Sequence, residues 1–153
     1  MLTRCSYANI AAVLWAETGE AGTCEFVRRL VFSVLIGNGD MHLKNWSVLY
    51  PDTPTPVQSP AYDFVATLPY IPRDTLALSF GGTKSLDCIT LDQVRRLADT
   101  ARLPMRPVLD IVRDTVAETR TAWKDSSHRG LIPADILKVI DGQIAKAIAG
   151  TKL

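Results

Sequence analysis

The stretch that decides the fold of this chain reads IGNGDMHLKN at positions 36–45, and PAYDF follows it at positions 60–64. These two stretches contain three polar residues at fixed spacing. Asn45 lies five positions after Asp40, and Asp63 lies 23 positions after Asp40. Such residues can act together only where the fold brings them together, so the segment between the two stretches decides what the pattern means.

That intervening segment is predicted to fold as a β-hairpin. Trp46–Tyr50 and Val57–Ala61 are strand-like, and three prolines lie between them in the stretch 51–56. Because proline cannot donate to a β-ladder, the chain must turn there. The second strand would return antiparallel to the first, and the hairpin would therefore bring Asp63 back beside Asn45.

The rest of the chain is predicted to be mainly helical, so the expected fold class is mainly α with a small β-hairpin. Gly19–Gly22 is expected to separate the first two helices, and Gly37 is expected to end the second. A further strand is expected at Leu76–Phe80, before the glycine pair Gly81-Gly82. Capping residues and apolar residues at helical spacing mark five helices: Ser6 to about Glu17, Cys24–Ile36 after a cap at Thr23, Leu91–Ala101 after Thr90, Pro104 or Pro107 to about Lys124, and Pro133 to about Ile148.

Length and composition are typical of one globular domain spanning residues 1–153. The net charge is +1, so no strong electrostatic field favours direct nucleic-acid or membrane binding. Arg28 and Arg29 are expected on a solvated helix face.

The longest apolar stretch, Leu30–Ile36, is too short to span a bilayer, and no secretion signal is visible at the N-terminus. Three widely spaced cysteines are interpreted as the reduced thiols of a cytoplasmic protein.

The polar residues around Asp40 have the chemistry that phosphoryl transfer needs. An amide oxygen of Asn45 and a carboxylate of Asp63 are ligands that Mg²⁺ prefers. Asp40 could accept the proton of an attacking hydroxyl, and His42 and Lys44 could add positive charge or a donor toward the transferred phosphate. This set is typical of a kinase catalytic loop and its metal-binding Asp. The alternative from the pattern alone is an Asn-Gly turn with solvated polar neighbours.

Three ordered blocks of the sequence resemble the C-terminal kinase lobe of the HipA toxin family. The blocks are LIGNGDMHLKN at 35–45, SPAYD at 59–63 and LALSFGG at 76–82, and the resemblance extends from about Tyr7 to Ala149. It implies a protein-kinase-like C-terminal lobe in which a helical body supports a small hairpin that carries the catalytic and metal loops.

The resemblance also implies residue roles and partners. Asp40 is similar to the family's catalytic Asp, and Asn45 and Asp63 are similar to its two magnesium ligands. His42 and Lys44 match the usual basic positions of the loop, where Lys44 would contact both cofactor and transferred phosphate. HipA-like proteins are Ser/Thr protein kinases that use Mg²⁺ and ATP, act as toxins in toxin–antitoxin pairs and promote persistence. Their implied partners are a HipB-like helix-turn-helix antitoxin and a protein substrate, with glutamyl-tRNA synthetase as the family precedent.

The sequence departs from a complete member of that family in two respects. Phe64 follows Asp63, but Val65 stands where the metal-binding loop usually has Gly. No phosphate-covering loop, ATP-contacting Lys or hinge of an N-terminal lobe is recognised before Asp40. Weak or no ATP binding and little transfer are therefore expected from this chain alone. The chain is expected to be a fragment, a truncated product, or half of a split enzyme whose N-lobe is a separate polypeptide.

Two other functions fit parts of the sequence. A free C-terminal lobe could be a non-catalytic binding module that holds an antitoxin or a substrate protein. A metal-dependent hydrolase could instead use Asp40, His42, Asn45 and Asp63. The second histidine of the chain, His128, has no ligand spacing to the first, which disfavours the hydrolase.

Overall fold

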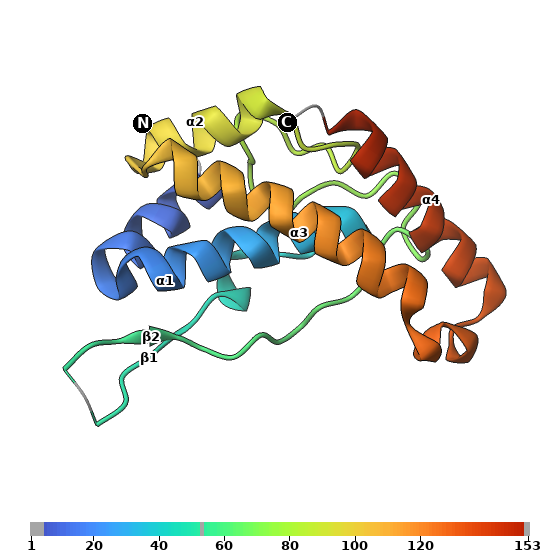
Figure 1. Ribbon diagram of the computed structural model, residues 1–153, viewed down its shortest axis with the longest axis horizontal. Coiled ribbons are helices and arrows are strands. Elements are labelled where there is room, and N and C mark those ends of the chain that lie inside the picture. The colour runs from blue at the N-terminus through green and yellow to red at the C-terminus, as the bar shows by residue number, and fades with distance from the viewer. Residues whose placement is uncertain (1–4, 53, 152–153) are drawn as a thin grey trace.

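Helix α1, which spans Tyr7–Ile36, is the central element of the fold. The computed structural model describes residues 5–52 and 54–151. Along the chain, these residues form α1, the 3₁₀ helix η1, the strands β1 and β2, the helices α2 and α3, the 3₁₀ helix η2 and the helix α4. In Figure 1, α3 runs alongside α1, α2 and α4 lie toward opposite ends of the molecule, and the hairpin of β1 and β2 extends away from the helices.

The C-terminal helices lie where the sequence predicts them. Thr90 caps the first of them and accepts the Gln93 N–H at 3.2 Å, while Pro104 and Pro133 directly precede the other two. None of the helices in the described ranges is long and apolar enough to cross a membrane. The elements of this region are α2 (Leu91–Ala101), α3 (Met105–Asp125), η2 (Ser127–Leu131) and α4 (Ala134–Gly150).

The predicted break within α1 is confined to one residue. Gly19 has a φ of 66° and a ψ of −156°, and it is the single position of α1 with non-helical backbone angles. Thr23 therefore lies inside the helix, where its hydroxyl donates to the Gly19 carbonyl at 2.9 Å. The expectation that Thr23 caps a separate helix at Cys24–Ile36 is wrong, because the helix resumes directly after the kink. Gly37 ends α1 as predicted, in the left-handed conformation with a φ of 74°.

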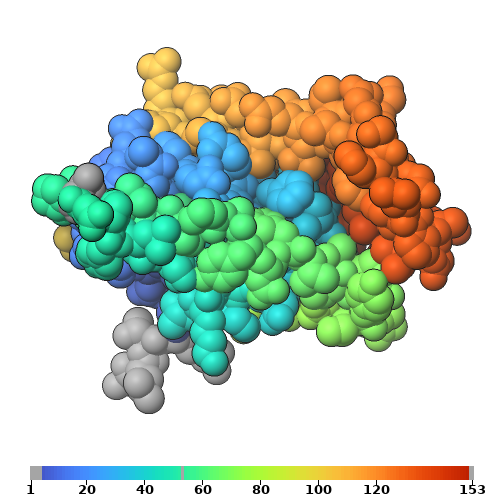
Figure 2. Space-filling view, turned by 90° about the horizontal axis from the view of Figure 1, so that it is seen from below, coloured from blue at the N-terminus to red at the C-terminus, as the bar shows by residue number. Residues whose placement is uncertain are grey.

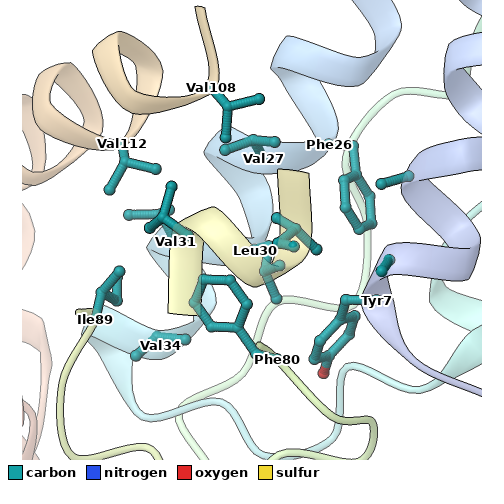
Figure 3. Packing of buried hydrophobic residues seen from close by; sticks show 14 of the residues in the cluster. Tyr7, Phe26, Val27, Leu30, Val31, Val34, Phe80, Ile89, Val108 and Val112 are labelled. Carbon is teal, nitrogen blue, oxygen red and sulfur yellow. The ribbon is translucent and has the colours of Figure 1, made fainter. Parts of the chain in front are cut away.

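The second half of α1 is buried, as its apolar residues predict. Figure 3 shows this half of the helix between Val108 and Val112 of α3 on one side and Tyr7 and Phe80 on the other. The C-terminal end of α1 is consequently a rigid point from which the next loop leaves the core. The apolar side chains of this half with a relative exposure of 1% or less are Phe26, Val27, Leu30, Val31, Val34 and Leu35.

The predicted hairpin forms, with strands shorter than expected. β1 spans Val48–Leu49 and β2 spans Val57–Gln58, and the two pair antiparallel with Val48 opposite Gln58. The chain between them turns through the proline-rich segment, as the sequence predicts.

The strand expected at Leu76–Phe80 does not form. Ser79 instead makes an isolated parallel bridge to Ser6, and Phe80 makes an isolated antiparallel bridge to Thr83. The glycine pair that follows reverses the chain at once, and this reversal brings Thr83 back onto Phe80 before a ladder can extend. Both ends of the segment are nevertheless buried in the core.

A carboxylate of α4 holds the end of α3 and η2 together. Asp141 accepts the indole N–H of Trp123 at 2.7 Å and two guanidinium hydrogen bonds from Arg129 at 2.9 and 2.8 Å. The Arg129 guanidinium also lies 5.2 Å from the centre of the Trp123 ring. Hydrogen bonds from Arg129 and then Trp123 hold the pKa of Asp141 below its ordinary value.

A second polar residue of α4 reaches the end of α1. The Gln143 side chain is buried, and its amide nitrogen donates to the Val34 carbonyl at 2.9 Å and to the Leu86 carbonyl at 2.6 Å. The Val34 carbonyl also accepts the Gly37 N–H at 3.2 Å, so Gln143 adds a second hydrogen bond to a carbonyl at the end of the helix. Gln143 therefore connects the last turn of α1, the loop before α2 and the C-terminal helix at one point.

Candidate functional site

The loop after α1 presents Asp40 to solvent on a fixed backbone. Asn38 and Met41 are buried on either side of it, whereas Asp40 is exposed. The Asn38 side-chain oxygen accepts the Asp40 N–H at 3.0 Å, and the Asn38 N–H donates to the Ser33 carbonyl at 2.8 Å. The Tyr7 hydroxyl donates to the Met41 carbonyl at 2.9 Å, and burial raises the pKa of this phenol well above its ordinary value. The hydroxyl therefore remains a hydrogen-bond donor at physiological pH.

Asn45 and Asp63 meet, as the predicted hairpin requires. Asn45 is the last residue of η1 (Leu43–Asn45), and it has a relative exposure of 5%. Its side-chain nitrogen donates to Oδ2 of the exposed Asp63 at 2.6 Å. One further backbone hydrogen bond, from Ser59 N–H to the Ser47 carbonyl at 2.9 Å, extends the hairpin pairing toward this point. The prediction that Asp63 returns to Asn45 is confirmed.

Tyr62 fixes the segment that carries Asp63 against η1. Its hydroxyl donates to the Lys44 carbonyl at 2.9 Å and lies 2.5 Å from the Ser47 hydroxyl oxygen. A phenol has one proton, so Ser47 is the donor in the second bond. Together with the Asn45–Asp63 bond, these contacts join the two sides of the site at three points.

The backbone of Asp63 adopts a conformation that is rare for a residue with a side chain. Its φ is 59°, in the left-handed region, where Asp is among the residues tolerated best. The next residue, Phe64, packs against Phe32 of α1 with ring centroids 5.6 Å apart. Strained backbone that surrounding contacts hold in place is frequent at functional sites. The observed φ therefore adds weight to a functional role for Asp63.

The donor set of Asn45 and Asp63 fits a hard divalent cation. The Asn45 side-chain oxygen is buried and has no hydrogen-bond partner within residues 5–52 and 54–151. A half-turn of the amide would exchange its oxygen and nitrogen, so that two oxygens would face one cation. These two side chains, which already meet at 2.6 Å, would hold Mg²⁺ through an amide oxygen and a carboxylate oxygen, ligands that this cation prefers.

The ligand cluster that a hydrolase would need is not found in the described part of the chain. Those residues contain no group of three or more His, Cys, Asp or Glu side chains that could hold a metal ion. His128 is exposed in η2, as the sequence suggested.

His42 and Lys44 differ in exposure. His42 is partly buried, and its Nδ1 atom is buried without a hydrogen-bond partner within residues 5–52 and 54–151, whereas Lys44 is exposed. The roles proposed for His42 and Lys44 from the sequence stay predictions.

A groove of about 360 Å³ runs beside the Asp63 segment, between α1, α3 and residues 61–64. Figure 2 shows α1 (blue to cyan) between α3 (orange) and the segment that follows β2 (green). Arg29 lines this groove with a side-chain exposure of only 11% and donates to Glu25 at 2.7 Å, while Arg28 donates to the same carboxylate at 2.6 Å. The expectation of a solvated arginine pair is therefore wrong for Arg29, because α3 and the returning chain both line that side of α1.

Glu25 is expected to stabilise the fold in a pH-dependent way. Partial burial disfavours its charge, but hydrogen bonds from Arg29 and Arg28 outweigh this and hold its pKa below the ordinary value. A depressed folded-state pKa stabilises the fold above the unfolded-state pKa, about 4.3, and this contribution is lost as pH falls through the folded-state value. Glu25→Gln should therefore lower the free energy of unfolding by about 1 kcal/mol at pH 7, after allowance for solvent screening. Urea unfolding from pH 7 to pH 3 measures this difference, which should shrink with falling pH.

Glu17→Gln is the matched control, because Glu17 is an exposed acid of the same helix for which the described residues give no ion pair. A loss at Glu25→Gln that persists undiminished at pH 3 would show that packing, and not charge, is responsible.

Three residues of the site could not be assigned from the sequence. Tyr7 and Tyr62 anchor the two loops through hydroxyl bonds to backbone carbonyls, and Thr67 contacts the backbone before Asp40. Tyr62 had one available signal, its position directly before Asp63. Tyr7 lies 33 positions before Asp40 and Thr67 lies 27 positions after it, and no local pattern connects either residue with the loop of Asp40.

Comparison with known proteins finds sequences that are related to this chain. The family model described as "HipA-like C-terminal domain" matches residues 2–123. A protein of Sinorhizobium fredii named as a candidate kinase, Y4dM, is 47% identical over 137 residues, which cover 89% of this chain and 34% of the relative. A candidate kinase of Haemophilus influenzae is 40% identical over 67 residues, which cover 42% of this chain and 20% of that protein.

A solved structure shares the fold. It is described as the toxin–antitoxin system HipA and HipB of Shewanella oneidensis MR-1 with its operator DNA. The TM-score is 0.75 at 21% identity, and the match covers 93% of this chain and 35% of the other. The chain thus spans about a third of the length of the Sinorhizobium relative and of the Shewanella chain.

Proposed function

Because the chain belongs to the HipA-like C-terminal domain family, we propose that it forms the lobe of a Ser/Thr protein kinase that carries the catalytic base and the magnesium ligands. The observation that carries this proposal is the direct pairing, at 2.6 Å, of Asp63 with Asn45, which follows the exposed Asp40 by five positions. The kinase names of the two sequence relatives support the same reaction class.

In this proposal each polar residue has a separate task. The exposed Asp40 carboxylate accepts the proton of the attacking Ser or Thr hydroxyl of a protein substrate. Asn45 and Asp63 hold Mg²⁺ through oxygen atoms. When bound, Mg·ATP supplies the phosphoryl group and the cation that neutralises charge developing on the phosphates. His42 and Lys44 contribute a donor and positive charge toward the transferred phosphate.

The proposed enzyme needs contacts beyond those of this chain. The sequence has no glycine-rich loop that could cover phosphates, and α1 leads directly into the catalytic loop. We propose that a second lobe, on the same or a separate polypeptide, supplies the adenine and phosphate contacts. Mg·ATP should then leave the unfolding temperature of this chain alone unchanged.

Asp63→Asn tests the metal pair. Asn tolerates the left-handed backbone of this position, so the variant removes charge and keeps the conformation. With the second lobe present, Mg·ATP at a hundredfold excess over its dissociation constant should stabilise the unmodified protein by about 2.7 kcal/mol. Asp63→Asn should lose most of this gain, as measured by thermal unfolding with and without EDTA.

Asp52→Asn is the matched control, because Asp52 lies exposed in the turn of the hairpin, away from Asn45. An equal Mg·ATP gain in Asp63→Asn and in the unmodified protein would contradict the proposed metal site.

A protein partner is a further part of the proposal. The Shewanella structure contains HipB and operator DNA, and on that basis we propose that this chain also associates with a HipB-like helix-turn-helix protein. Co-elution of the two purified proteins on size-exclusion chromatography tests the association, and separate elution at micromolar concentration would contradict it.

A further inference from the structure

The position of the Asp40 carboxylate depends on its backbone alone. Asp40 is exposed, and no hydrogen bond or ion pair to its side chain is found within residues 5–52 and 54–151. A catalytic base must be held within a few tenths of an ångström of its productive position. Whatever fixes the backbone from Gly37 to Met41 therefore fixes the base.

Thr67 contacts this backbone on both sides of Asn38. The Thr67 side chain is buried, and its hydroxyl oxygen accepts the Gly39 N–H at 2.8 Å. Its own N–H donates to the Gly37 carbonyl at 3.0 Å. The Ala77 N–H, further along the same returning segment, donates to the Gly39 carbonyl at 2.8 Å. Residues 67–77 therefore bind both peptide groups of the residue that precedes Asp40.

Asp74 decides which way the Thr67 hydroxyl points. The hydroxyl oxygen lies 2.5 Å from Asp74 Oδ2 and 3.1 Å from the Gly37 carbonyl, and it has a single proton. The shorter, charge-assisted contact takes this proton, so a lone pair of the hydroxyl is left facing Gly39. The other Asp74 oxygen accepts the Thr75 N–H at 2.8 Å, which fixes the carboxylate in turn.

The close approach of Gly39 to this pair requires the absence of a side chain. A Cβ atom on Gly39 would lie 2.2 Å from Asp74 Oδ2 and 2.8 Å from the Thr75 carbonyl oxygen. The loop before Asp40 is therefore in contact with the Thr67–Asp74 pair through backbone, without an intervening side chain that could adjust.

We propose that Thr67 and Asp74 are positioning residues for Asp40, which hold the catalytic loop through the Gly39 peptide. The inference rests on the proposed function for the role of Asp40, but the holding of the loop is measurable without phosphoryl transfer. Neither residue belongs to the set of Asp40, His42, Lys44, Asn45 and Asp63 to which the site chemistry is assigned.

Amide hydrogen exchange on the chain itself tests this inference. In Thr67→Val, which keeps the shape and removes the hydroxyl, exchange of the Gly39 N–H should be about tenfold faster. The Asn38 N–H, bonded to Ser33 within the same turn, is the internal reference and should change much less. Thr67→Ser keeps the hydroxyl and should leave the Gly39 rate within about threefold of the unmodified chain.

Thr115→Val is the control for loss of a buried threonine hydroxyl, because Thr115 donates to the Ile111 carbonyl within α3. It should not change Gly39 exchange. If Thr67→Val fails to fold, Asp74→Ala provides the same readout with an expected increase of a few fold. An unchanged Gly39 rate, or equal rates in Thr67→Val and Thr67→Ser, would overturn the inference whether or not the protein transfers phosphate.

Where transfer is measurable, kcat should fall about tenfold in Thr67→Val with an unchanged KM for ATP, and Thr67→Ser should restore it. A change confined to KM, or an equal loss of kcat in both variants, would overturn the positioning role. Absence of transfer in the unmodified enzyme would instead contradict the proposed function, and the exchange rates would still decide whether the two residues hold the loop.

Discussion

Asp40→Asn is expected to lower the rate of phosphoryl transfer by about 10²–10⁴-fold, because the amide cannot accept the proton of the attacking hydroxyl. Asp40 is exposed and its backbone bonds do not involve its carboxylate, so the stability of the fold should change by less than about 0.5 kcal/mol. This separation between rate and stability distinguishes a catalytic residue from a structural one. The rate is measured as transfer from labelled ATP, with the second lobe present on the same polypeptide or added in trans.

Asp114→Asn is the matched control, because Asp114 is an exposed carboxylate on α3 that the described residues leave without an ion pair. It should retain the full rate. The assignment of Asp40 as the base would be abandoned if Asp40→Asn retained more than about a tenth of the rate, since removal of a general base costs more than that.

Phe26→Ala is expected to lower the free energy of unfolding by about 3–5 kcal/mol. The Phe26 ring is fully buried and packs on Trp46 with centroids 4.5 Å apart, and Trp46 in turn lies 6.4 Å from Tyr7. The loss is large against the total stability of about 5–15 kcal/mol that is typical of a domain. Because Trp46 directly follows Asn45, the cavity would open beside the proposed magnesium ligand as well as in the core.

Urea unfolding followed by tryptophan fluorescence measures this loss. Phe32→Ala is the matched comparison, because Phe32 lies on the same helix, is partly exposed and should cost about 1–2 kcal/mol. Phe26→Leu should recover much of the difference by refilling the cavity. A loss below about 1 kcal/mol in Phe26→Ala would mean that Trp46 collapses into the space, and that the ring contact does not support the loop.

The parts of the fold that follow from local chemistry could be predicted from the sequence. Thr90 and Ala101 delimit α2 as expected, because the capping side chain and the helix it begins are neighbours in sequence. The meeting of Asn45 and Asp63 was also predictable, because prolines between two short strands leave a hairpin as the simplest path.

The parts that depend on distant chain segments could not be predicted. Leu76–Phe80 looks like a strand, but Ser79 bridges to the distant Ser6, and no local pattern marks Ser6 as its partner. Arg29 belongs to a polar pair in the sequence, but it lines a groove between α3 and the chain that returns past Ala61, and both lie far from it in sequence. The role of Thr67 is likewise set by where its loop returns, over Gly37 and Gly39.

The bond between Gln143 and Val34 has a consequence for the newly made protein. It joins residues 109 positions apart, across the end of the helix that leads to Asp40. At a synthesis rate of about 5–20 residues per second, the ribosome takes about 5 to 20 seconds to reach Gln143 after Val34. Once Asp63 has been made, within that interval, the nascent chain contains every residue of the proposed site, but the last turn of α1 still lacks its final partner. The geometry around Asp40 is therefore completed only late in translation.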